Sequence, residues 1–140
     1  MVYKAKRKKD ILSKDAVCNI MVVDDNDDIL LTIKTGLEEK GFKIHSFKTV
    51  ESALEAFEQH PNSYYDLVLT DVCMPNMNGF ALYLCLKEKN PSLKIVFMTA
   101  FDIPLGEFRG ILPSVELSDI IKKPFSISDL ATRIRYILIS

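Results

Sequence analysis

Hydrophobic residues along this chain alternate between two arrangements. Five short stretches are almost continuously apolar and rich in β-branched residues, which is typical of strands buried on both faces of a sheet. They occupy residues 17–23, 42–47, 66–70, 93–98 and 120–122. Between them, apolar residues recur every three or four positions, which predicts amphipathic helices. We expect helices over 27–40, from Thr49 or Ser52 to before Pro61, over 80–89, in a short piece of 104–111, and after Ser126.

This alternation of strands and helices predicts the fold class. Parallel strands need crossover connections, and each predicted helix supplies one. We therefore expect an α/β fold of the flavodoxin-like, doubly wound kind, with a five-stranded parallel sheet in the order 2-1-3-4-5 and five helices. Residues 17–140 would form this single domain. In the helix over 80–89, we expect Phe80 and Leu84 to face the core together with Leu82 and Leu86.

The composition agrees with a globular domain and indicates the cellular compartment in which we expect it. The apolar fraction of 48% is enough for a core, and the sequence has no apolar run long enough to span a membrane. The cysteines Cys18, Cys73 and Cys85 are far apart and form no C-x-x-C pair. Buried thiols in a reducing compartment are the simplest interpretation, so we expect a cytoplasmic protein.

The charge is distributed unevenly along the chain. Residues 1–16 carry six basic and two acidic side chains, whereas the remaining residues carry more acids than bases. We interpret residues 1–16 as a disordered basic arm, because blocks of like charge are usually unstructured. The alternative is a patch that contacts nucleic acid, anionic lipid or a partner protein. For the folded domain itself we expect no contact with nucleic acid or membrane.

Unusual polar residues follow four of the predicted strands. Asp24 and Asp25 end the first, Asp71 the third, Thr99 the fourth and Lys123 the fifth. Carboxyl ends of parallel strands meet at one edge of a sheet, where ligands bind in such folds. Carboxylates brought together there suit Mg²⁺ with a phosphate. The lysine and threonine could bind phosphoryl oxygens, and an aspartate is a competent nucleophile for an acyl phosphate.

Taken singly, each of these residues is more often structural, as a helix cap or a turn. The ordered set is far more specific: Asp24-Asp25, Asp71-x-x-Met74-Pro75 with Gly79, Thr99-Ala100 and Lys123-Pro124-Phe125. This set resembles the receiver domain of two-component response regulators, as in chemotaxis regulators. The resemblance covers about residues 17–140, which is essentially the whole predicted domain.

The resemblance implies a role for each of these residues. Asp71 would accept a phosphoryl group, and Mg²⁺ would be held by Asp24, Asp25, Asp71 and the backbone carbonyl of Cys73. Thr99 and Lys123 would contact the phosphoryl group, and the bond between Lys123 and Pro124 would be cis. Such a domain is not an enzyme, because it accepts the group on itself. The donor would be a histidine kinase or a phosphotransfer protein of a phosphorelay, and the output an effector protein or a homodimer.

Two features depart from the family pattern and keep alternatives open. Ile120 stands where receivers commonly carry an aromatic ring, and residues 101–118 lack the usual helical sequence. Both features are compatible with a structural receiver that signals without phosphorylation. A Mg²⁺-dependent phosphatase of the haloacid-dehalogenase type is a weaker alternative. That family has Asp-x-Asp after a strand, whereas here Cys73 stands two residues after Asp71, in place of the second aspartate. We interpret His45 and His60 as structural.

Overall fold

The strands form one parallel sheet in the predicted order. The computed structural model describes residues 17–72, 79–100, 110 and 119–140. Its sheet runs β2-β1-β3-β4-β5, and every neighbouring pair is parallel. The strands are β1 (Asn19–Val23), β2 (Lys43–Phe47), β3 (Leu67–Asp71), β4 (Lys94–Thr99) and β5 (Ile120–Lys122). The flavodoxin-like order 2-1-3-4-5 is therefore confirmed.

Four helices of the described residues connect and cover these strands. They are α2 (Asp27–Glu39), α3 (Val50–Glu58), α4 (Gly79–Lys89) and α6 (Ile127–Ile139). The hydroxyls of Thr49 and Ser126 accept backbone N–H groups three residues on, as expected of N-caps, and the side chain of Asn26 does the same for α2. Of the short helix expected in 104–111 only Gly110 is described, in helical conformation. The arm 1–16 lies outside the described residues.

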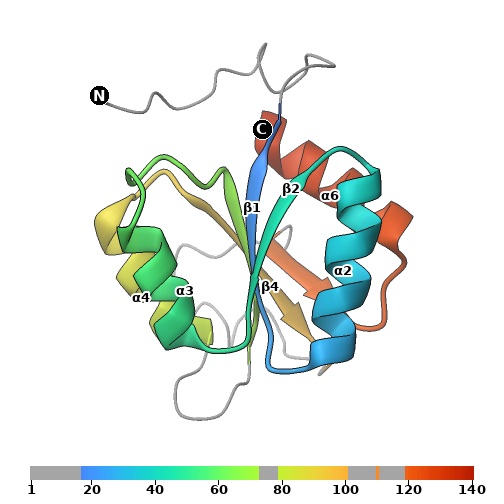
Figure 1. The fold of residues 1–140 in the computed structure, drawn as a ribbon, viewed down its shortest axis with the longest axis horizontal. Helices are drawn as coiled ribbons and strands as arrows, with labels where there is room; N and C mark the ends of the chain where they lie inside the picture. The colour runs from blue at the N-terminus through green and yellow to red at the C-terminus, as the bar shows by residue number, and fades with distance from the viewer. Residues whose placement is uncertain (1–16, 73–78, 101–109, 111–118) are drawn as a thin grey trace.

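The sheet separates two hydrophobic layers. Helices α2 and α6 lie on one face and α3 and α4 on the other (Figure 1). Strand β1 shows the period of two that this requires, because Ile20 and Val22 pack in the layer under α2 and α6, whereas Met21 and Val23 pack in the layer under α3 and α4. All five residues of β1 are buried, which explains its continuous apolar sequence.

Two local details depend on packing between helices. A methyl group at Gly36 of α2 would lie 2.6 Å from the side chain of Ile127, so a glycine lets α2 approach α6 closely. The expected core position of Leu84 is wrong: its side chain is 58% exposed. Leu82, Tyr83 and Leu86 form the buried face of α4, and Leu84 lies two residues, or about 200°, around the helix from Leu82.

Within the described part of the chain, no helix is long and apolar enough to cross a membrane.

Candidate functional site

Three carboxylates come together at the carboxyl edge of the sheet. Asp24 and Asp25 directly follow β1, and Asp71 is the last residue of β3. These two strands pair in register, so their ends lie side by side. One oxygen of each carboxylate lies within 4.8 Å of the others. Asp24 is fully buried, Asp71 is half-buried and Asp25 is exposed, so the group opens from the interior toward solvent.

Asp24, whose carboxylate is buried, is held by three hydrogen bonds. Its backbone N–H donates to the carbonyl of Phe47 at 3.1 Å, which ties it to the end of β2. One carboxylate oxygen accepts the backbone N–H of Asn26 at 2.9 Å. The other accepts the ammonium of Lys123 at 2.8 Å. Both oxygens of this fully buried group therefore have a donor, as a buried carboxylate requires.

Lys123 brings a positive charge to this group from the end of β5. Its Nζ lies 2.8 Å from Asp24 Oδ2 and 3.5 Å from Asp71 Oδ2. Burial acts to lower the pKa of this ammonium, but the hydrogen bond and charge of Asp24, with the charge of Asp71, raise the pKa above its ordinary value of 10.5. The peptide bond between Lys123 and Pro124 is cis, as expected. Among the residues that the structure describes, the ammonium of Lys123 contacts two of the three carboxylates, so the group keeps a formal negative charge that suits a divalent cation.

Thr99 ends β4 beside this group and is buried, with 3% of its surface exposed. Its carbonyl accepts the backbone N–H of Lys123 at 2.7 Å, so the threonine and the lysine are fixed to each other through the backbone. Strand β4 also pairs with β3, opposite Asp71. The strand order thus places Thr99 on the strand between β3, which ends in Asp71, and β5, which Lys123 follows.

Gly79 is required by a close backbone contact. Its N–H donates to the carbonyl of Val72 at 2.9 Å, which brings the start of α4 back to the end of β3. A methyl group at this position would overlap the carbonyl oxygen of Asp71. This close contact therefore explains why the sequence motif has a glycine at position 79.

Two other sequence observations have different outcomes. Cys73, with Met74 and Pro75, lies outside the described residues. Ile120 is half-buried and packs in the layer under α3 and α4, and its carbonyl accepts a guanidinium N–H of Arg133 at 3.1 Å. The aliphatic side chain is therefore part of the core at this position.

A groove borders the acidic group on one side. It has a volume of about 560 Å³ and joins the first turns of α2 to the segment after β5. It is lined by Asp28, Ile29, Thr32, Ile33, Ala100, Lys123, Pro124 and Phe125. Sequence reasoning found the lysine but missed the contribution of α2, because the sequence does not show which helix face lies beside the strand ends.

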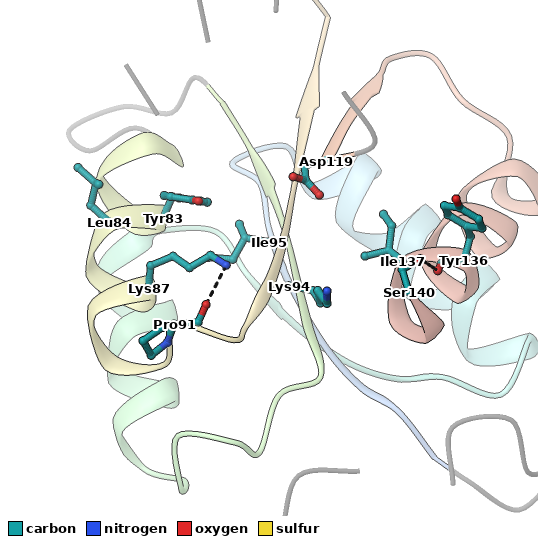
Figure 2. Close-up of a pocket in the computed structure, with 10 residues that line it drawn as sticks. All are labelled: Tyr83, Leu84, Lys87, Pro91, Lys94, Ile95, Asp119, Tyr136, Ile137 and Ser140. Carbon is teal, nitrogen blue, oxygen red and sulfur yellow. Dashed lines mark hydrogen bonds between the residues drawn. The ribbon is translucent and has the colours of Figure 1, made fainter. Parts of the chain in front are cut away.

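A second cavity, of about 590 Å³, lies between α4 and α6 (Figure 2). Lys94 at the start of β4 and Asp119 just before β5 line it, so it opens at the opposite edge of the sheet from the carboxylates. Lys87 reaches from α4 toward β4, and its ammonium donates to the carbonyl of Pro91 at 3.3 Å. This cavity is separate from the acidic site.

The fold and this arrangement of residues define a receiver domain, and comparison with known proteins assigns the family. The family model of the response regulator receiver domain matches residues 20–135. The chain therefore belongs to the receiver domain family of two-component response regulators.

Individual relatives agree with this assignment. The response regulator receiver protein CpdR of Brucella abortus is 31% identical over 121 residues, which cover 86% of this chain and 97% of that protein. Chemotaxis protein CheY4 of Vibrio cholerae has the same fold, with a TM-score of 0.76 at 20% identity over 87% of this chain and 99% of that chain. The BeF3-activated DrrB receiver domain gives a TM-score of 0.72 at 25% identity, over 87% of this chain and 97% of that chain. The chain spans about half the length of other curated relatives that it matches, 51% and 52% in two of them.

Proposed function

We propose that this receiver domain accepts a phosphoryl group on Asp71 in the presence of Mg²⁺ and thereby changes the partner that it binds. The observation that carries the proposal is the group of three carboxylates within 4.8 Å of one another, next to the ammonium of Lys123. Removal of Asp71 should therefore abolish uptake of the group. The domain would be the substrate of its kinase rather than an enzyme.

The carboxylates fit a magnesium ion by their chemistry. Mg²⁺ prefers hard oxygen ligands and keeps several waters, so a few carboxylates at a partly open site suit it better than a closed cage. Asp24, Asp25 and Asp71 would hold the ion, together with the backbone carbonyl expected from Cys73. When bound, the ion would neutralise negative charge on a transferring phosphoryl group.

Asp71 is the carboxylate best placed to react. The side chain of Asp71 is 15% exposed and its Oδ2 lies 3.5 Å from the ammonium of Lys123, so an incoming phosphoryl group could reach it beside a positive charge. Asp24 is fully buried, with both of its oxygens bonded inside the protein, and Asp25 is exposed at the outer side of the group. An oxygen of Asp71 would form a bond to phosphorus while the bond between phosphorus and the imidazole of a phosphohistidine breaks. The imidazole leaves as the neutral ring after taking up a proton. The product is an acyl phosphate on this protein.

Lys123 and Thr99 would hold the transferred group. The ammonium of Lys123 lies 3.5 Å from Asp71, so a small shift would bring it to a phosphoryl oxygen on that residue. The hydroxyl of Thr99 would donate to a second oxygen. The acyl phosphate would carry about −1.5 to −2 charges at neutral pH where the Asp71 carboxylate carried −1, and its new oxygens would rearrange these contacts and shift the domain between two states. The two states would differ in affinity for an effector protein or for a second copy of the domain.

One observation favours a second candidate, a receiver that signals without phosphorylation. Ile120 is packed into the core where the family commonly has an aromatic ring, so a swing of that ring cannot take part in the switch. Such a module would bind its partner equally well with and without the modification.

Binding of beryllofluoride, a phosphoryl mimic, tests the proposal directly. We expect amide NMR signals of the wild type to shift on addition of beryllofluoride only when Mg²⁺ is present. Asp71→Asn should give no such shift. Asp27→Asn is a matched control, because Asp27 lies in the first turn of α2 near the site but pairs with Lys48 at 3.1 Å instead. Failure of the wild type to respond, with Mg²⁺ bound, would refute phosphoryl binding and leave the unphosphorylated receiver.

A further inference from the structure

The two histidines of the chain lie together although 14 residues separate them in the sequence. His45 is on β2 and His60 follows α3, and their ring centroids are 6.2 Å apart. With Tyr64 and Tyr65 they form a cluster of four rings, which we call the histidine–tyrosine cluster. The rings of His60 and Tyr64 stack at 3.8 Å, and Tyr64 meets Tyr65 edge to face at 5.0 Å. Since β2 is one of the two outer strands of the sheet, this cluster attaches an edge strand to the segment before β3.

One hydrogen bond joins the two sides of the cluster. Nδ1 of His45 lies 2.9 Å from the hydroxyl of Tyr65, which is only 2% exposed. Burial, followed by the effect of Tyr64, raises the pKa of the Tyr65 phenol to about 12, so the phenol keeps its proton at neutral pH. A neutral His45 can therefore accept this proton at Nδ1. A protonated His45 is a donor at Nδ1, so the tyrosine hydroxyl would have to turn its hydrogen elsewhere.

The charges around His45 also oppose its protonation. Lys43 lies on the same strand and donates to the hydroxyl of Tyr64 at 3.4 Å, Lys34 acts from α2, and His60 acts from the end of α3. Burial first, and then Lys43, His60 and Lys34, lower the pKa of His45 below its ordinary value of 6.5.

We propose that the histidine–tyrosine cluster is an acid-sensitive contact, called the lock below. It keeps edge strand β2 paired in the sheet at neutral pH and releases the strand when His45 takes up a proton. The unfolded chain binds a proton at about pH 6.5, before the folded chain does, so stability falls as the pH drops below that value. The end of β2 also carries the carbonyl of Phe47, which accepts the N–H of Asp24 at 3.1 Å. Release of the strand would therefore loosen the backbone support of the acidic site. This proposal does not depend on whether Asp71 is phosphorylated.

Two measurements test the lock. The first is an NMR titration of the two histidine Cε1–H signals. The second is hydrogen exchange of the β2 amides at about pH 7.5 and about pH 5.5, which lie on either side of the ordinary pKa of histidine. We expect His45 to titrate below 6.5 and the β2 amides to exchange faster, relative to those of β3, at the lower pH. In His45→Asn, whose amide can replace Nδ1 as a hydrogen-bonding group but does not titrate, this difference between the two pH values should be lost. His60→Asn identifies the remaining signal and should move the pKa of His45 upward, because it removes one of the groups that lower that pKa.

Two results would overturn the lock. One is titration of His45 at or above 6.5 in the wild type. The other is equal acceleration of β2 exchange in the wild type and in His45→Asn. If His45→Asn fails to fold, Tyr65→Phe replaces it, because loss of the hydroxyl should raise exchange at β2 already at about pH 7.5, and unchanged exchange would contradict the proposal.

Discussion

Replacement of Lys123 by methionine removes the ammonium that lies 2.8 Å from the fully buried carboxylate of Asp24. Methionine has nearly the same length and can fill the same space, so the main change is in charge. The variant leaves three neighbouring carboxylates without this counter-charge. We expect it to be less stable than the wild type in the absence of divalent cations.

The magnitude follows from burial. Breaking a fully buried ion pair by removing one partner costs about 3–5 kcal/mol. The side chain of Lys123 is 17% exposed and that of Asp71 is 15% exposed, so water screens part of the interaction. We therefore expect the free energy of unfolding to fall by about 2–3 kcal/mol. Mg²⁺ should restore part of this loss if the carboxylates bind it, because the cation replaces the missing positive charge.

Urea denaturation with and without Mg²⁺ measures both effects. Lys48→Met is the matched control, since Lys48 pairs with Asp27 but the two side chains are 57% and 75% exposed. An exposed pair contributes at most about 1 kcal/mol, and we expect little change. The reasoning is refuted if Lys123→Met loses no more stability than Lys48→Met without Mg²⁺.

Three further substitutions test separate parts of the structure. Gly79→Ala should lower stability by about 1–3 kcal/mol in urea denaturation, because the new methyl group overlaps the carbonyl of Asp71; unchanged stability would contradict this contact. Tyr65→Phe should reduce the loss of stability between pH 10 and about 12, because the Tyr65 phenol ionises at a lower pH in the unfolded chain than in the folded protein. A loss of stability as steep as that of the wild type would argue against burial of this phenol. Asp25→Asn should weaken Mg²⁺ binding about tenfold in calorimetry while stability stays nearly constant, since Asp25 is exposed; unaltered affinity would exclude it as a ligand.

Most of the fold could be predicted from the sequence because its signals are local. Continuous apolar stretches such as β1 require burial on both faces, and alternation with helices leaves few topologies. The carboxyl ends of the strands then had to meet at one edge, so the convergence of Asp24, Asp25 and Asp71 followed from topology.

What the sequence did not reveal depends on contacts between elements. Helical spacing alone did not show that Leu84 faces solvent, because several leucines of α4 compete for the core and only packing selects among them. The contact of Gly36 with Ile127 joins helices far apart in the chain. The neighbourhood of His45 and His60 likewise has no sequence signal, since β2 and the end of α3 meet only in the folded chain.

The most direct test of the central claim is the intact mass of the protein after incubation with acetyl phosphate and Mg²⁺. We compare the wild type with Asp71→Asn and with Asp27→Asn, which leaves the three clustered carboxylates in place. A single added phosphoryl group in the wild type and in Asp27→Asn, but not in Asp71→Asn, is the predicted result. An adduct that persists in Asp71→Asn, or no adduct in the wild type, would contradict the assignment of Asp71 as the phosphoacceptor.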